Sequence, residues 1–360
     1  MASFVYAASF DPAGSSDGVY GFRWHPGQRR LDAFGVAGDE VENPLCLETD
    51  PTNRYLYVGD CRARWQSGGS ISAYRINPAT GELDSCNSVA SAGVIPVFLQ
   101  VTPDGRNLLA ANCGPFATGC EGRTVAVFPL KKHGHLGPAK AIHQHAGTST
   151  DPERQTSPHP HCIAVDPQSQ YVWVPDLGTD SIWCYAFDER LGALLHQPEN
   201  SVHVAANSGP RLLKFHPNGK FAYLLNEIAC SLIVYGYHAG KLDELQTVSA
   251  LPSGLEERNA SDLIIHPGGR YLYTTNRSQD CISVFDIDGE TGIASLRGQI
   301  RTRGKALRGI ALDRRGRFLL AGNEGADTVQ GFQILEDGAL TDLGVLAEMP
   351  GPACLKFVEF

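Results

Sequence analysis

Residues 210–226, PRLLKFHPNGKFAYLLN, contain the pattern that decides the fold. A proline precedes an apolar run, a turn around Pro-x-Gly, a second apolar run and a polar end, which is typical of a β-hairpin. The pattern recurs along the chain as PLCLETDPTNRYLYVGD from Pro44, PVFLQVTPDGRNLLAAN from Pro96, PHCIAVDPQSQYVWVPD from Pro160, ASDLIIHPGGRYLYTTN from Ala260, LRGIALDRRGRFLLAGN from Leu307 and, truncated, PACLKFVEF from Pro352. Seven starts are therefore visible.

Each full copy continues into further β-rich runs such as SIWCYAF and SLIVYGY, which gives four short strands in about 50 residues. Repeats of this length without helical periodicity are typical of propeller blades. The last copy offers one strand, while FVYAASF and GVYGFRW at the N-terminus offer the later strands of a blade. We therefore predict an all-β, seven-bladed propeller of four-stranded antiparallel blades. It forms a single domain over residues 1–360, with the last blade closed by joining the N- and C-terminal strands.

The composition is that of an ordinary globular protein, with 42% hydrophobic and 19% charged residues. A net charge of −9 and the absence of a Lys/Arg block argue against a nucleic-acid partner. No apolar run approaches the ~20 residues that span a bilayer, so no membrane partner is expected. The N-terminus lacks a basic region of the kind that begins a signal peptide. We therefore expect a cytoplasmic protein, either a monomer or a small homo-oligomer.

Nine of the ten cysteines fall into two groups. Six lie in apolar strand-like runs, where free cysteine behaves as a small hydrophobe: Cys46, Cys162, Cys184, Cys230, Cys281 and Cys354. Cys113 and Cys120 lie instead in the Gly-rich segment NCGPFATGC, with Cys61 nearby, which leaves a redox or metal-binding role open.

Equal counting from each start predicts where polar side chains converge. Alternation places the first, third and fifth residues after each start on one packed face, as with Arg211, Leu213 and Phe215. The first of these residues is Leu45, Val97, His161, Arg211, Ser261, Arg308 and Ala353 in successive copies. A hairpin returns to the same end after about 16 residues, at Cys61, Cys113, Leu177, Glu227, Arg277 and Glu324. Six ionisable side chains should thus meet at one mouth of the channel, namely His161, Arg211, Glu227, Arg277, Arg308 and Glu324.

Three segments resemble the lactonase family of seven-bladed propellers: RQTSPHPH at 154–161, GPRLLKFHPNGKFAYLLNE at 209–227 and TTNR at 274–277. This family includes the propeller-type 6-phosphogluconolactonases and, more distantly, carboxy-muconate lactonising enzymes. The resemblance implies that His161, Arg211 and Glu227 match the family's catalytic His, Arg and acid, and that Arg277 and Arg308 match further arginines at the mouth. Leu212 departs from the pattern, because family members usually carry histidine there. Insertions around CRARWQSGG and NCGPFATGC also leave the substrate open.

Hydrolysis of a lactone needs a base for water, a donor for the oxyanion and positive charge for an acidic substrate. His161 or Glu227 is the predicted base, and Arg211 or Arg277 the oxyanion donor. The predicted substrate-binding residues are Arg308, Glu324, His159 and Arg154. The predicted route is direct attack by water on a small anionic lactone, without a cofactor.

Three alternatives stay open. The same side chains could run a cycloisomerisation, in which a carboxylate adds to a double bond and His161 or Glu227 delivers the proton. The His143-x-His145 and His159-x-His161 pairs suggest a metal site, although arginines crowding the mouth argue against a cation. A non-catalytic propeller that binds a protein at its loop-bearing face is the third alternative.

Overall fold

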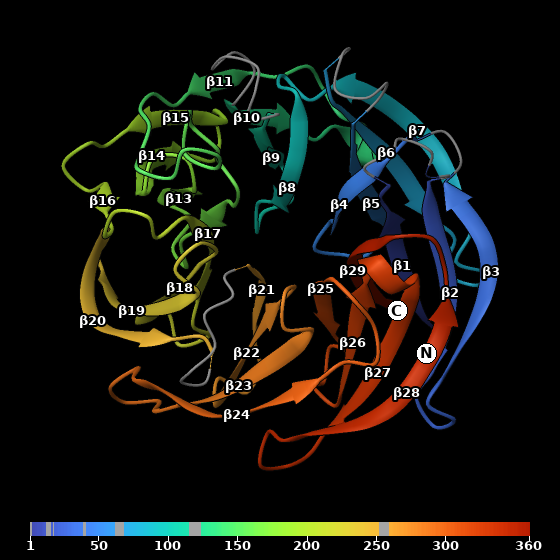
Figure 1. Cartoon of the computed structure of the whole chain (residues 1–360). Coiled ribbons are helices and arrows are strands. Elements are labelled where there is room, and N and C mark those ends of the chain that lie inside the picture. Colours follow the sequence, from blue (N-terminus) through green and yellow to red (C-terminus); the bar gives the residue numbers. More distant parts are fainter. Residues whose placement is uncertain are drawn as a thin grey trace.

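Seven antiparallel sheets stand around a central axis in the computed structural model, which describes residues 2–11, 16, 18–38, 41–61, 68–114, 124–251 and 259–360 (Figure 1). Among these residues no helix is long and apolar enough to cross a membrane. The seven-bladed architecture predicted from the repeat is confirmed.

Each blade takes its inner strand from the start of one sequence copy. Blade 1 comprises β4 (Pro44–Thr49), β5 (Tyr55–Asp60), β6 (Ser70–Ile76) and β7 (Leu83–Ala90). Blade 2 comprises β8 (Ile95–Val101), β9 (Asn107–Cys113), β10 (Thr124–Pro129) and β11 (Ala141–Gln144), with a short 3₁₀ turn, η2 (Lys132–Gly134). Blade 3 comprises β12 (Ala164–Val165), β13 (Tyr171–Asp176), β14 (Ser181–Asp188) and β15 (Ala193–His196), with β16 (Val202–His203) also paired to β14.

The remaining four blades have the same order from the axis outward. Blade 4 comprises β17 (Pro210–Phe215), β18 (Phe221–Asn226), β19 (Ser231–His238) and β20 (Lys241–Ser249). Blade 5 comprises β21 (Ala260–Ile265), β22 (Tyr271–Asn276), β23 (Cys281–Ile287) and β24 (Ala294–Arg301). Blade 6 comprises β25 (Leu307–Leu312), β26 (Phe318–Asn323), β27 (Thr328–Ile334) and β28 (Leu340–Glu348), with η3 (Glu324–Ala326) after β26.

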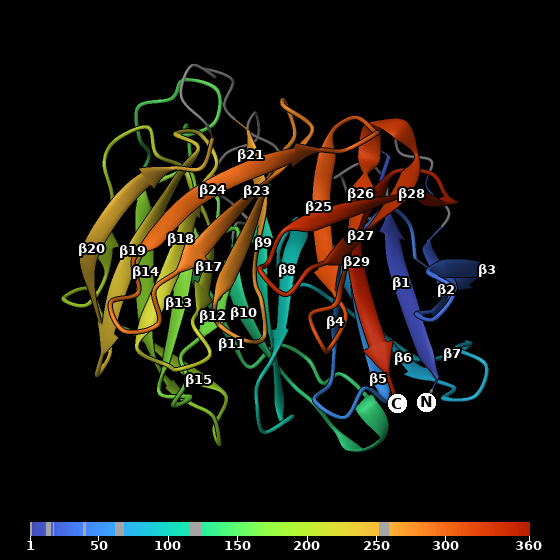
Figure 2. The same ribbon diagram turned by 90° about the horizontal axis from the view of Figure 1, so that it is seen from below.

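Blade 7 joins the two ends of the chain, as predicted. Its order is β29 (Pro352–Glu359), β1 (Ser3–Ser9), β2 (Val19–His25) and β3 (Arg30–Gly38). The antiparallel pairing of β29 with β1 begins at Ser3 opposite Glu359, so the two termini lie side by side at one end of the ring (Figure 2). This pairing removes the open edge that the ring would otherwise present.

The hydrophobic core is divided among the spaces between neighbouring sheets. Seven clusters of buried side chains are each drawn mainly from two adjacent blades, as where Trp173 of blade 3 packs with Leu213 and Tyr235 of blade 4. Every blade therefore depends on both neighbours for its apolar burial. The inner strands lie next to the axis of the ring, and their side chains line a central channel.

Candidate active site

A β-bulge near the start of the inner strands positions the residues of the mouth. In five blades the pairing with the second strand skips one residue, which is Leu45, Val97, Arg211, Arg308 or Ala353. In blade 5, Ser261 and Asp262 together oppose Thr275. A bulge interrupts alternation and re-aims a side chain. The expectation that Arg211 and Leu213 share a face is therefore wrong: Arg211 lines the channel, whereas Leu213 is buried between blades 3 and 4.

Glu227 is the centre of the charged network at this mouth. Its Oε1 accepts a hydrogen bond from Arg154, and its Oε2 accepts one from Arg211. Arg277 Nη2 lies 3.2 Å from the same Oε2. Burial alone would raise the pKa of Glu227, but the three guanidinium groups outweigh it and bring this pKa to about 2. Glu227 is therefore ionised across the physiological range, with both oxygens occupied.

Arg211 connects this network to His161. Its Nη1 lies 2.7 Å from His161 Nε2, and its Nε donates to the carbonyl of Ser261 at 2.7 Å. Because a guanidinium group only donates, Nε2 is the acceptor and the proton of the neutral imidazole lies on Nδ1. Burial, and then the charge of Arg211, hold the pKa of His161 well below its ordinary value. His161 is therefore neutral at cellular pH, with the Nε2 lone pair directed at Arg211.

His159 and Arg277 are the remaining buried residues of the network. The His159 ring centroid lies 5.7 Å from that of His161. Burial, followed by the charge of Arg154, lowers the pKa of His159 to about 3. Burial lowers the pKa of Arg277 to about 9, although Glu227 opposes this shift. Both histidines are thus uncharged neighbours of a group of guanidinium ions.

Arg308 and Glu324 form a separate pair at the same mouth. Arg308 Nη1 donates to Glu324 Oε2 at 2.8 Å, and its guanidinium lies 4.8 Å from the centre of the Phe10 ring. Arg308 lines the channel together with His161 and Arg211. Arg308 adds to the positive charge felt by Arg211 and Arg277. We call the ionisable residues from the segment before blade 3 and from blades 3 to 6 the cationic arc: Arg154, His159, His161, Arg211, Glu227, Arg277, Arg308 and Glu324.

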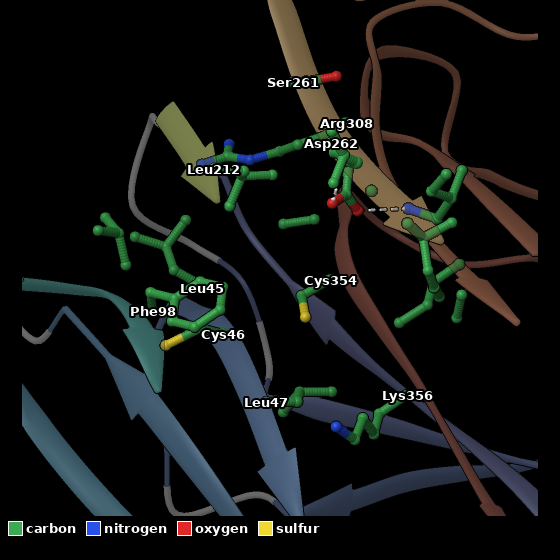
Figure 3. A pocket seen from close by; sticks show the side chains of 18 of the residues that line it. Leu45, Cys46, Leu47, Phe98, Leu212, Ser261, Asp262, Arg308, Cys354 and Lys356 are labelled. Carbon is green, nitrogen blue, oxygen red and sulfur yellow. Dashed lines mark hydrogen bonds between the residues drawn. The ribbon is translucent and has the colours of Figure 1, made fainter. Parts of the chain in front are cut away.

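The opposite side of the mouth is apolar. Phe10, Leu45, Cys61, Ile95, Cys113 and Ala353, from blades 7, 1 and 2, form one buried cluster, which we call the apolar arc. Figure 3 shows the corresponding division inside the channel, with Leu45, Cys46 and Phe98 facing Ser261, Asp262 and Arg308 across the cavity. Burial raises the pKa of the Cys61 thiol. This favours the hydrophobic role for Cys61, while Cys120 lies outside the described residues.

The channel encloses a cavity of about 300 Å³. Leu212 stands on its wall beside Arg211, where the family usually has histidine, so this part of the wall is apolar. Four further charged side chains line the cavity, and their charges balance: Glu48, Lys214, Asp262 and Lys356. Lys356 Nζ donates to Glu48 at 2.6 Å, and Asp262 accepts the amide of Ile310 at 2.8 Å. Unbalanced positive charge is therefore concentrated at the mouth.

The histidine pairs that suggested a metal do not form a ligand set. His145 Nδ1 lies 2.6 Å from Asp176 Oδ2, and its ring stacks on Trp183 at 4.1 Å. His159 binds the other oxygen of Asp176 through its backbone amide, at 2.7 Å. Within the described ranges no three His, Cys, Asp or Glu side chains are grouped so as to hold a metal ion. Metal independence itself stays a prediction.

Sequence reasoning missed Asp176 and Asp180, which hold the segment before blade 3. Asp176 accepts from the amides of His159 and Gly178, and Asp180 accepts from the hydroxyl of Ser149. The repeat carried a signal for Asp180, because Asp280 and Asp327 occupy the same place in later copies. Asp176 ends its copy at the position where most other copies have asparagine, so the repeat did not single it out as a functional residue.

Comparison with known proteins agrees with this fold. The family described as a lactonase with a seven-bladed β-propeller matches residues 4–357. The chain therefore belongs to the propeller lactonase family, and the resemblance noted in the sequence is confirmed.

Individual relatives carry a more specific name. The chain is 30% identical to a Bacillus subtilis 6-phosphogluconolactonase over 350 residues, which is 96% of each chain. It is 31% identical to the Pectobacterium carotovorum 6-phosphogluconolactonase over 306 residues, 84% of each chain. The structure of a periplasmic gluconolactonase from Pseudomonas aeruginosa superimposes with a TM-score of 0.90 at 27% identity, and the match covers 100% of this chain and 99% of that one. The family and its named relatives support a hydrolase acting on lactones.

Proposed function

We propose that this chain hydrolyses 6-phosphogluconolactone or a closely related anionic sugar lactone. The observation that carries the proposal is the charge of the cationic arc. Arg154, Arg211, Arg277 and Arg308 supply four positive charges and Glu227 and Glu324 two negative ones, so with both histidines neutral the arc has a net charge of +2. A phosphate group near neutral pH carries a complementary charge, and guanidinium groups bind phosphate in a bidentate manner.

His161 is the base that this arrangement favours. Its neutral imidazole lines the cavity, and Nε2 is engaged only by Arg211 among the described residues. When the substrate's oxygens draw Arg211 toward them, Nε2 becomes available to a water molecule. Glu227 is a poor base here because both of its oxygens are paired with guanidinium groups. Its role in the proposal is to hold three guanidinium groups together.

The proposed reaction balances with these groups. The oxygen of water adds to the lactone carbonyl carbon while His161 Nε2 takes its proton. Arg211 faces the oxyanion that develops on the carbonyl oxygen, where a fixed positive charge is most effective. The ring C–O bond then breaks, the imidazolium returns the proton to the departing hydroxyl oxygen, and the open-chain acid remains. No protein-bound intermediate is required.

A substrate panel tests the proposal. We expect purified protein to hydrolyse the phosphorylated sugar lactone faster than its unphosphorylated counterpart in a pH-stat assay corrected for spontaneous opening, with no loss of activity on adding a chelator. Turnover of muconates, followed by ultraviolet absorbance, without turnover of lactones would instead indicate the cycloisomerase. No turnover of either class would favour the binding scaffold.

A substitution of His161 tests its role. His161→Ala should lower lactone turnover by at least ~10²-fold, the scale of losing a general base. A folded His161→Ala protein with a near-normal rate would exclude His161 as the base. Activity abolished by a chelator and restored by a divalent metal would contradict the metal-independent reaction. The cytoplasmic location also stays a prediction.

A further inference from the structure

The segment of residues 145–160, which we call the strap, crosses from β11 to β12 and carries Arg154 to Glu227. Its turn closes on itself: Ser149 N donates to the carbonyl of Gln155 at 2.9 Å, and Arg154 N donates to Asp151 Oδ1 at 2.8 Å. The side chain of Gln155 donates to the carbonyl of Leu177 at 2.9 Å, which ties the turn to blade 3. The backbone of Arg154 is therefore fixed, although its side chain is the most exposed of the three guanidinium groups on Glu227, at 34%.

Asp180 joins the strap to the segment that leads into blade 4. Its Oδ2 accepts from Ser149 Oγ at 2.6 Å and from Asn207 N at 2.7 Å. Its Oδ1 accepts from Gly209 N at 2.7 Å and from Ser208 N at 3.1 Å. The side chain is buried, so each of these bonds is shielded from water. One carboxylate thus fixes two stretches of chain that are distant in sequence.

Both stretches lead to a residue that contacts Glu227. Gly209 directly precedes Pro210 and Arg211, and its carbonyl accepts the backbone amide of Glu227 at 2.8 Å. Ser149 lies at the other end of the turn that presents Arg154. A displacement of Asp180 would therefore move Arg211 and Arg154 relative to the carboxylate that they share.

The other blades show which of these contacts belong to the architecture. At the same place in the repeat, Cys230 Sγ accepts from Asn259 N at 3.2 Å and Asp327 Oδ1 accepts from Gly351 N at 2.8 Å. All three residues have left-handed backbone conformations, with φ of +47° at Asp180 and Cys230 and +57° at Asp327. A contact to the entrance of the next blade is thus repeated in blades 4 and 6, whereas Asp280 Oδ1, at the same place in blade 5, has no hydrogen-bond partner among the described residues. Among these three side chains, the bond to the strap is made by Asp180.

We propose that Asp180 is a positioning residue that holds Arg154, through Ser149, and Arg211, through residues 207–209, against Glu227, and that Arg154 held in this way selects lactones carrying a phosphate group. The selectivity rests on the proposed function, whereas the positioning does not. The experiments below separate the two.

Hydrogen exchange of the free protein tests the positioning. Asp180→Asn should speed the exchange of at least one of the amides of Asn207, Ser208 and Gly209 by at least tenfold, since an amide side chain offers one acceptor oxygen in place of two. The matched control is Asp166→Asn, a similarly buried aspartate at the other end of blade 3, which accepts the amides of Gln170 and Tyr171 at 2.6 Å. Unchanged exchange at 207–209 in Asp180→Asn, or the same acceleration in the control, would overturn the positioning role.

A double-mutant cycle tests the route through Arg154. Ser149→Ala removes only the bond to the strap, and it should raise KM for 6-phosphogluconolactone about tenfold with kcat changed less than about threefold, the scale of one hydrogen bond to a charged group. In the Arg154→Ala background the same substitution should have no further effect. An equal rise in KM in both backgrounds, or no rise in either, would refute the route.

The same cycle distinguishes failure of the inference from failure of the proposed function. The unphosphorylated lactone should show no change in KM with Ser149→Ala, because it lacks the group that Arg154 binds. If the wild-type protein hydrolyses only unphosphorylated lactones, the proposed substrate is wrong and so is the selectivity of Arg154. The exchange experiment still decides whether Asp180 positions the two segments.

Discussion

The cationic and apolar arcs occupy the same positions of the same repeat, yet they differ in chemistry. Arg211 and Arg308 stand at the bulges of blades 4 and 6 as Leu45 and Ala353 stand at those of blades 1 and 7. Cys113 ends β9 in blade 2 at the place that Glu227 has in blade 4. The bulge is thus common to both sides of the mouth, and charged side chains occupy it only in the cationic arc. An isolated buried charge costs several kcal/mol, which only a network such as that around Glu227 offsets.

The largest effect is expected where the apolar arc closes the ring. Deleting residues 353–360 removes most of β29, including Leu355 and Val358 from the cores on both sides of blade 7. The shortened chain should lack a cooperative thermal transition and near-ultraviolet dichroism, because the ring loses its closing strand. A truncated protein with an unchanged melting temperature would show that closure does not stabilise the fold.

Arg211→Ala should give the largest loss of activity in the cationic arc without unfolding the protein. Arg211 contacts Glu227, His161 and the carbonyl of Ser261, so its loss should lower kcat/KM by ~10³-fold, at the upper end for removing one donor to an oxyanion. Steady-state kinetics on a sample with native circular dichroism gives the measurement. A loss below tenfold would remove Arg211 from the reaction.

The buried histidines of the cationic arc, which have no counterpart in the apolar arc, should make the free energy of unfolding depend on pH. An unfolded histidine takes up a proton near pH 6.5, whereas burial keeps the pKa of His159 at about 3 and that of His161 well below 6.5. Below pH 6.5 the unfolded chain therefore binds more protons, and the free energy of unfolding should fall as the pH is lowered. His159→Gln should reduce the slope between pH 6 and 5 by about 1.4 kcal/mol per pH unit, the value for one proton, in urea titrations. An unchanged slope would mean that His159 is charged in the folded state.

The smallest effect is expected from the counterpart of Glu227 in the apolar arc. Cys113→Ala removes a buried sulfur that packs with Cys61 and Ile95, so it should change kcat/KM by less than about threefold and lower the melting temperature by a few degrees. A large loss of activity would show that the apolar arc takes part in the reaction and would revive the redox or metal role considered for Cys113.

Counting along the repeat predicted much of the candidate site, because equal steps from each start reach the same end of every blade. It brought His161, Arg211, Glu227 and Arg277 to one mouth, and the structure joins these four through Arg211 and Glu227. It failed where the strands depart from regular alternation. Strict alternation gave Arg211 the face of Leu213, and only the pairing of β17 with β18 reveals the bulge that separates them.

The sequence by itself determined the seven blades, their closure and the residue types at the mouth, because these follow from local alternation and from the period of the repeat. The tertiary structure decided which charges pair, which imidazole nitrogen of His161 contacts Arg211, and how Asp180 joins the strap to the entrance of blade 4. The physical reason is that a pairing between distant segments depends on where their backbones pass one another. The spacing of Ser149, Asp180 and Gly209 along the chain does not predict that these residues contact one another.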